Sequence, residues 1–206
     1  MHVATSTPGG QRCLFAPALR VVLERGHPPE RVEVMRRRQT SPCALALPGP
    51  RAYPPDVNPF EELTALVDAL ASAKVDYALC GAVALAVYGA PRATQDIDVL
   101  VRPEDVARVR EVARGLGFTL ESHPMKFSSG FTVHRVVKLI GTQPFMLDLI
   151  EASEALAAIF EGRETILAGE QSMQVVSRDG LVAMKLAAGR PQDVIDVQRL
   201  KELGDD

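Results

Sequence analysis

Apolar and polar positions follow two different periods from residue 56 onward. After Asn58-Pro59, apolar residues recur every three or four positions up to Leu70, the spacing of an amphipathic helix that a proline can begin. We expect strands over residues 75–80, 96–102, 131–140, 145–150 and 171–177, and helices over residues 82–88, 103–115, 153–160, 179–189 and 191–203. This succession predicts an α+β fold, a small mixed β-sheet flanked by helices with a C-terminal helical segment.

The pattern before residue 56 is different. Residues 1–55 contain nine of the 15 prolines, and eight arginines against three glutamates give the stretch a charge of about +5. The Arg36-Arg37-Arg38 run is either a nucleic-acid contact or a solvated charge run. Because the prolines interrupt any helical period, we expect an irregular N-terminal arm over residues 1–55 and a folded domain over residues 56–206.

The composition excludes several classes of protein. The 206 residues carry 23 lysines and arginines against 26 aspartates and glutamates, with a formal net charge of -3. Together with a mean hydropathy of +0.05, this balance excludes a disordered polyampholyte, a histone-like polycation and a membrane protein. The three cysteines, Cys13, Cys43 and Cys80, have no metal-like spacing. We therefore expect a cytoplasmic protein with no membrane partner.

Two aspartates on the strand expected at 96–102 give the first chemical signal. Because side chains alternate between the faces of a strand, Asp96 and Asp98 point to one side while Ile97 and Val99 point into the core. Neighbouring carboxylates repel each other unless a cation lies between them, and Mg²⁺ prefers such oxygen ligands. Taken alone, an Asp-x-Asp pair is also typical of a solvated strand end or turn.

A third carboxylate favours a metal site. Asp148 lies in the otherwise apolar strand expected at 145–150, where a charge without a partner is costly. If this strand lies beside the one with Asp96 and Asp98, the three carboxylates could hold two divalent ions about 3.5–4 Å apart, as in phosphoryl transfer. The alternative is that Asp148 is a buried acid paired with an arginine such as Arg135.

The segment before the acidic pair is a candidate nucleotide-binding site. Gly81 and Ala82 lie where an expected strand ends and a helix begins, and a turn without bulky side chains lets phosphate oxygens approach backbone N–H groups. Arg92 could bind a triphosphate. Thr94 could hydrogen-bond a phosphate or only its own turn.

These motifs resemble a known family. Residues 77–99, with Gly-Ala-Pro-Arg-Ala-Thr shortly before Asp-Ile-Asp, resemble the active-site signature of the DNA polymerase β-like nucleotidyltransferase superfamily. Within that superfamily they look most like AbiEii-type toxins and related minimal nucleotidyltransferases. Residues 176–200 are similar to the same group's helix with an inward lysine, followed by Arg-x-x-Asp-x-x-Asp. The resemblance covers about residues 60–203.

The resemblance implies roles for the acidic residues and the cofactor. Asp96 and Asp98 would be metal ligands shared with the nucleotide triphosphate. Asp148 would be the third ligand, which positions or deprotonates the attacking hydroxyl. The metal would be Mg²⁺ or Mn²⁺, bound as two ions.

The resemblance also implies roles further along the chain. Lys185 would neutralise phosphate charge. Asp193 and Asp196, on one helix face, would orient Lys185 and Arg190, touch the nucleotide, or form a structural salt bridge. Ala82 stands where many members have serine or a second glycine, so we expect weakened or altered nucleotide binding.

The leading hypothesis is a metal-dependent nucleotidyltransferase that moves a nucleoside monophosphate from an NTP to an acceptor hydroxyl. The resemblance implies RNA, including tRNA ends, as the acceptor, and a toxin with a cognate antitoxin. A protein or small-molecule acceptor, and a nucleotide-binding module without catalysis, are the alternatives. The acidic balance of residues 56–206 argues against a large RNA-binding face, although Lys126, Arg135 and Lys138 could form a basic patch.

Overall fold

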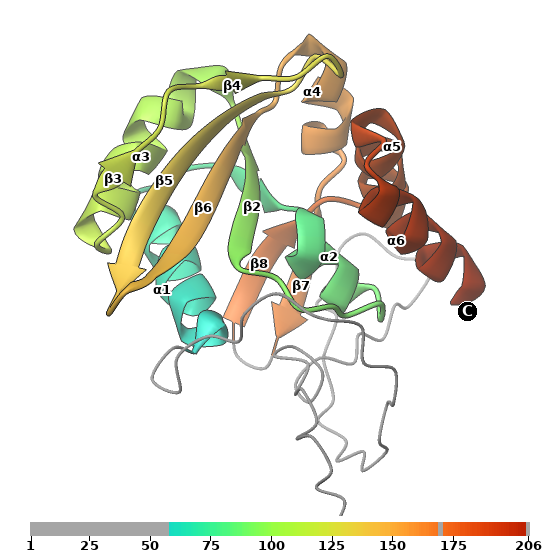
Figure 1. The fold of residues 1–206 in the computed structure, drawn as a ribbon, viewed down its shortest axis with the longest axis horizontal. Coiled ribbons are helices and arrows are strands. Elements are labelled where there is room, and N and C mark those ends of the chain that lie inside the picture. The colour runs from blue at the N-terminus through green and yellow to red at the C-terminus, as the bar shows by residue number, and fades with distance from the viewer. Residues whose placement is uncertain (1–57, 169–170, 205–206) are drawn as a thin grey trace, which may run out of the picture.

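A computed structural model of the protein describes residues 58–168 and 171–204 (Figure 1). The arm predicted for residues 1–55 lies outside the described residues. Its irregular structure and the domain boundary at residue 56 therefore stay predictions.

The described residues form helices and strands that alternate along the chain. The helices are α1 (Pro59–Ser72), α2 (Gly81–Val87), α3 (Val106–Gly115, after a 3-10 turn at Pro103–Asp105), α4 (Glu154–Glu161), α5 (Arg178–Ala188) and α6 (Pro191–Glu202). The strands are β1 (Tyr77–Leu79), β2 (Asp96–Val101), β3 (Leu120–Glu121), β4 (Met125–Lys126), β5 (Thr132–Ile140), β6 (Gln143–Glu151), β7 (Glu164–Ala168) and β8 (Gln171–Val175).

The strands form one mixed sheet in the order β3-β5-β6-β2-β1-β8-β7, and β4 pairs with β5. The β2–β6 and β1–β8 pairs are parallel, and the other pairs are antiparallel. This arrangement confirms the predicted α+β fold with a mixed sheet flanked by helices. No helix in the described part of the chain is long and apolar enough to cross a membrane.

The helices lie in two groups (Figure 1). Helices α1 and α3 contact each other, and Lys138 Nζ on β5 lies 2.9 Å from both carboxylate oxygens of Glu62 on α1. Helix α2 contacts β2 and α5, and α5 packs along α6. The second group of helices therefore gathers near the strand that carries Asp96 and Asp98.

Local sequence signals explain most boundaries. Asn58 begins α1 as predicted, since its side chain accepts a hydrogen bond from the backbone N–H of Phe60 at 3.1 Å. The β5–β6 hairpin turns through Gly141 and Thr142 alone, whereas the strands expected over residues 131–140 and 145–150 left four residues between them. Gly141 has φ +61°, which a tight two-residue turn requires. The expected helices and strands all form, while β3, β4 and β7 were not expected.

Candidate active site

Three aspartates converge on one face of the sheet. Strands β2 and β6 are parallel neighbours, and Asp98 lies directly opposite Asp148. One carboxylate oxygen from each of Asp96, Asp98 and Asp148 lies within 4.8 Å of the others, close enough for all three to hold a metal ion. The intervening Ile97 is buried in the core, as the alternation of β2 predicts. We call these three residues the carboxylate triad.

The triad carries more negative charge than its surroundings neutralise. Burial, and then the charges of Asp96 and Asp148, raise the pKa of Asp98 from 3.8 to about 7. The positive charges of Arg190 and Arg92 offset only part of this rise. Such a cluster favours either a shared proton or a bound cation.

Asp148 has a cationic partner as well. Arg135 lies opposite it on β5, and its Nε and a terminal nitrogen donate to the two oxygens of Asp148 at 2.7 and 2.6 Å. The Asp148 residue as a whole is only 6% exposed. The two interpretations of Asp148 therefore hold together, because it belongs to the triad and is also paired with Arg135.

Gly81 brings the first turn of α2 against the triad. It has φ +57°, and a Cβ built on it would lie 1.8 Å from Oδ2 of Asp98. Any other residue would displace that carboxylate or the turn. Ala82 is buried next to it. The predicted nucleotide-binding segment therefore lies beside Asp98, while its contact with a nucleotide stays a prediction.

The loop before β2 also connects to the triad. The buried Thr94 hydroxyl donates a hydrogen bond to Oδ1 of Asp96. This bond orients a triad carboxylate rather than capping the turn alone. Thr94 thus lies in the site, and its contact with phosphate remains a prediction.

Lys185, Asp193, Asp196, Arg92 and Arg190 form a second charged cluster, the buried ion network. Lys185 Nζ lies 2.7 Å from Oδ2 of Asp196 and 3.3 Å from Oδ1 of Asp193, and all three side chains are at most 4% exposed. Arg92 Nε binds Asp196 at 3.2 Å, and Arg190 Nε binds Asp193 at 2.7 Å. Asp193 and Asp196 therefore form ion pairs with Lys185, Arg190 and Arg92, as both the orienting and the structural role require. The choice between these roles stays a prediction.

The network lowers the pKa values of its two carboxyl groups. Burial alone would raise the pKa of Asp193, but hydrogen bonds and charge from Arg190 and Lys185 bring it below its usual value. The pKa of Asp196 is lowered against burial in the same way, by Lys185, Gln192 and Arg92. Both aspartates are therefore ionised and neutralised. The predicted contacts of Lys185 and Asp193 with the nucleotide stay predictions.

The basic patch suggested for Lys126, Arg135 and Lys138 is wrong. Residues 135 and 138 are an odd number of positions apart on β5, so their side chains lie on opposite faces of the sheet. Arg135 binds Asp148, and Lys138 binds Glu62 on α1. Neither side chain contributes an unpaired charge to a common surface.

An apolar row that was not predicted leads to the triad. The row consists of Leu120, Val137 and Met146, which lie opposite one another on neighbouring strands. Met146 lies opposite Asp96 in turn, so the row shares one face of the sheet with the triad. Leu120 is 51% exposed, and Val137 and Met146 are half-buried. Val137 lies two positions from Arg135 on β5, and Met146 lies two positions from Asp148 on β6, so each shares a face of the sheet with that neighbour. Once β5 and β6 were paired, this spacing could have revealed the apolar row.

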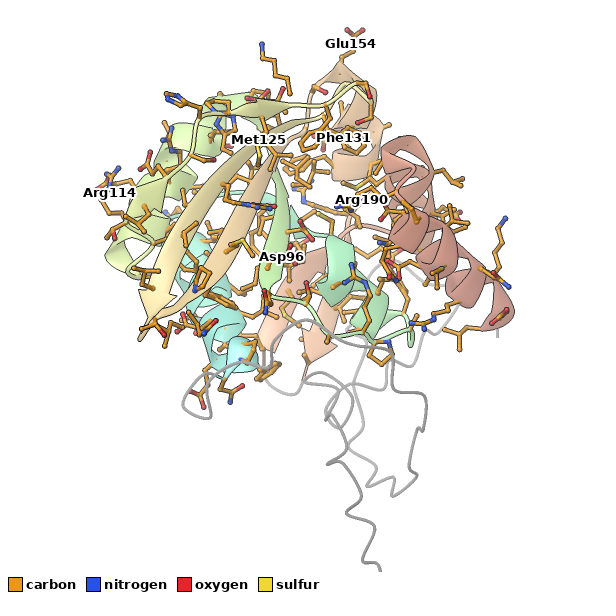
Figure 2. All side chains as sticks on the ribbon, in the orientation of Figure 1. Asp96, Arg114, Met125, Phe131, Glu154 and Arg190 are labelled. Carbon is orange, nitrogen blue, oxygen red and sulfur yellow. The ribbon has the colours of Figure 1, made fainter. Side chains whose placement is uncertain are left out.

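The two charged clusters come from distant parts of the chain. Figure 2 labels Asp96, at the start of β2, and Arg190, which precedes the first turn of α6. The charge of Arg190 acts on Asp98 and Asp96. The C-terminal helices therefore place cationic side chains close enough to the triad to influence it.

Comparison with known proteins gives a family and a fold. Residues 64–206 match the family described as "Nucleotidyl transferase AbiEii toxin, Type IV TA system". No curated protein matches the chain. The Thermotoga maritima protein TM1012, assigned as a nucleotidyltransferase, aligns with a TM-score of 0.50 and 14% identity over 69% of this chain and 92% of its own. ANT(2")-Ia, solved with adenylyl-2"-tobramycin, aligns with a TM-score of 0.50 and 18% identity over 72% of this chain and 91% of its own. At these identities the likeness shows the fold.

Proposed function

The chain belongs to the nucleotidyltransferase AbiEii toxin family, and on this premise we propose that it moves a nucleoside monophosphate from an NTP to an acceptor hydroxyl and releases pyrophosphate. The carboxylate triad carries this proposal, because its three oxygens lie within 4.8 Å of one another on two parallel strands.

The triad suits a divalent cation. Its donors are all carboxylate oxygens, which Mg²⁺ and Mn²⁺ prefer, and burial together with the charges of Asp96 and Asp148 raises the pKa of Asp98. We propose Mg²⁺ or Mn²⁺, bound as two ions, as the cofactor. When bound, the ions would stabilise the charge that develops on the phosphates during transfer.

The protein's own groups then have distinct tasks. Asp96 and Asp98 would hold the cations beside the triphosphate. Asp148 positions the acceptor hydroxyl and accepts its proton as the hydroxyl oxygen attacks the α-phosphorus. The bond from the α-phosphorus to the β-phosphate bridging oxygen breaks, and pyrophosphate leaves. In-line positioning and charge neutralisation account for the rate, since the protein forms no covalent intermediate.

The nucleotide occupies the side of the triad formed by α2 and the C-terminal helices. Gly81 allows close approach there, and Arg92 and Arg190 supply positive charge that acts on Asp98. Lys185 contributes by holding Asp193 and Asp196, and so the two arginines, in place. The acceptor lies on the other side of the triad, over the apolar row.

RNA, including tRNA ends, is the proposed acceptor, because the family is described as a toxin of a toxin–antitoxin system. The protein would then be the toxin of such a pair, beside a cognate antitoxin. A small-molecule acceptor is the second candidate. It is favoured by the ion pairs of Arg135 and Lys138, which remove two cations from any RNA-binding surface, and by the aminoglycoside adduct in the ANT(2")-Ia structure.

A transfer assay tests the proposal. Purified protein with Mg²⁺ or Mn²⁺ and each α-labelled NTP is incubated with total RNA and, separately, with aminoglycosides. We expect label on RNA that Asp98→Asn reduces by at least about 100-fold, whereas Asp179→Asn, an exposed control on α5, does not.

The possible results separate the alternatives. Label on the aminoglycoside instead of RNA would move the assignment to the small-molecule transferase. Full activity of Asp98→Asn would contradict the metal-ligand assignment. Absence of label on every acceptor, together with NTP binding that does not depend on Mg²⁺, would contradict catalysis.

A further inference from the structure

Arg135 occupies a special position beside the triad. Its guanidinium binds both oxygens of Asp148, at 2.7 and 2.6 Å, from the strand directly next to β6. Among the described residues, it is the one basic side chain hydrogen-bonded to a triad carboxylate. The function proposed for Asp148 does not explain why Arg135 is paired with it.

The geometry of this pair makes it more than a surface salt bridge. A bidentate guanidinium fixes both the position and the plane of a carboxylate. The Arg135 side chain is 33% exposed and the side chain of Asp148, taken alone, 9%, so the pair lies at the edge of the core. The charge of Arg135 also acts on Asp96 and Asp98. It therefore partly neutralises the whole triad.

Arg135 and a divalent cation would both be attracted to the same carboxylate. A cation at the triad needs an oxygen of Asp148, and both of these oxygens accept hydrogen bonds from Arg135. Positive charges held a few ångströms apart repel each other, so each weakens the binding of the other. A neutral side chain at position 135 would relieve this repulsion and would also leave Asp148 without its fixed orientation.

We propose that Arg135 is the resident counter-ion of the carboxylate triad, which orients Asp148 for transfer and competes with the divalent cation for it. Arg135 is a positioning residue, because it acts through Asp148. This inference rests on the metal-dependent transfer proposed above. It predicts that loss of the Arg135 charge changes metal affinity and transfer rate in opposite directions.

Manganese titration without nucleotide tests the inference. Metal-stripped protein is titrated with Mn²⁺, and free Mn²⁺ is followed by its electron paramagnetic resonance signal. We expect Arg135→Met to bind Mn²⁺ about tenfold more tightly than the wild type, and to lose about tenfold or more in transfer rate because Asp148 is no longer held. Arg135→Lys, which keeps the charge, should stay close to wild-type affinity for Mn²⁺.

Lys138→Met is the matched control. It removes the same charge from the same strand and breaks an ion pair on the opposite face of the sheet. We expect no change in its Mn²⁺ affinity. Circular dichroism establishes that each variant is folded. If Arg135→Met does not fold, Arg135→Gln takes its place, because glutamine keeps a hydrogen-bond donor near Asp148 without the charge.

Asp98→Asn separates the two proposals. If the wild type binds no Mn²⁺, or Asp98→Asn binds it equally well, the metal-dependent function and this inference both fail. If Asp98→Asn loses binding while the neutral variant at position 135 binds no more tightly than wild type, only the role of Arg135 is overturned. A neutral variant with unchanged transfer rate would also overturn it.

Discussion

The carboxylate triad and the buried ion network remove carboxylates from water with opposite electrostatic results. In the triad, burial and like charge raise the pKa of Asp98 to about 7. In the network, the pKa values of Asp193 and Asp196 fall below their usual range although burial opposes the change. Burial acts in the same direction in both regions, so the number of cationic partners decides the outcome.

The difference predicts that the network mainly stabilises the fold and that the triad binds a cation. Two aspartates in the network share three cations, which join α5 and α6 to the loop before β2. In the triad, one arginine, Arg135, pairs with one of the three aspartates, Asp148. The carboxylates of the network are neutralised by its cations, whereas the triad keeps negative charge that a cation can neutralise.

Lys185→Met should produce the largest change in stability. It removes the central cation of the network and leaves Asp193 and Asp196 buried with only their arginine partners, Arg190 and Arg92. Breaking a buried pair in this way costs about 3–5 kcal/mol. Urea denaturation followed by circular dichroism measures the free energy of unfolding.

Lys201→Met, on the exposed side of α6, is the matched control and should change stability little. If Lys185→Met unfolds at the wild-type urea concentration but loses NTP binding, Lys185 belongs to the nucleotide site. The contrast between the two clusters would then be wrong.

The same substitution in the two clusters should have opposite effects. Asp196→Asn removes the charge that holds Lys185 and Arg92, and should cost about 2–3 kcal/mol. Asp98→Asn relieves repulsion in the triad, so in EDTA its stability should equal or exceed that of the wild type by up to about 1 kcal/mol. The free energy of unfolding of both variants would be measured by urea denaturation at pH 8. A loss of stability in both variants would show that the triad is also a structural cluster.

The triad could be predicted because strand geometry determines most of it. Alternation along β2 places Asp96 and Asp98 on one face, and a charge in the apolar β6 requires a partner. The sequence left open whether Asp148 joins the triad or pairs with Arg135. Only the register of three neighbouring strands shows that it does both.

The buried ion network was harder to predict. Asp193 and Asp196 share a helix face in the sequence pattern, but the packing of α5 against α6 brings Lys185 between them. Arg92 lies 104 positions from Asp196, so local spacing could not assign it to the network.

Strands β3 and β4 were missed for a different reason. They have two residues each, too few to show a period.

The pH dependence of stability should sharpen the comparison with the smallest effect. In EDTA, the folded protein holds a proton on Asp98 up to a pKa of about 7, while the unfolded chain releases it near 3.8. Between these values the folded state binds more protons, so stability falls as the pH rises from about 4 to 7 and is level above it. Because solvent reaches part of the Asp98 side chain, we expect its titration to lower the free energy of unfolding by at most about 1 kcal/mol over this pH range. The measurement is the difference between wild type and Asp98→Asn in urea denaturation at pH 5 and pH 8. A difference that does not change with pH would mean that Asp98 is already neutralised, as Asp193 and Asp196 are.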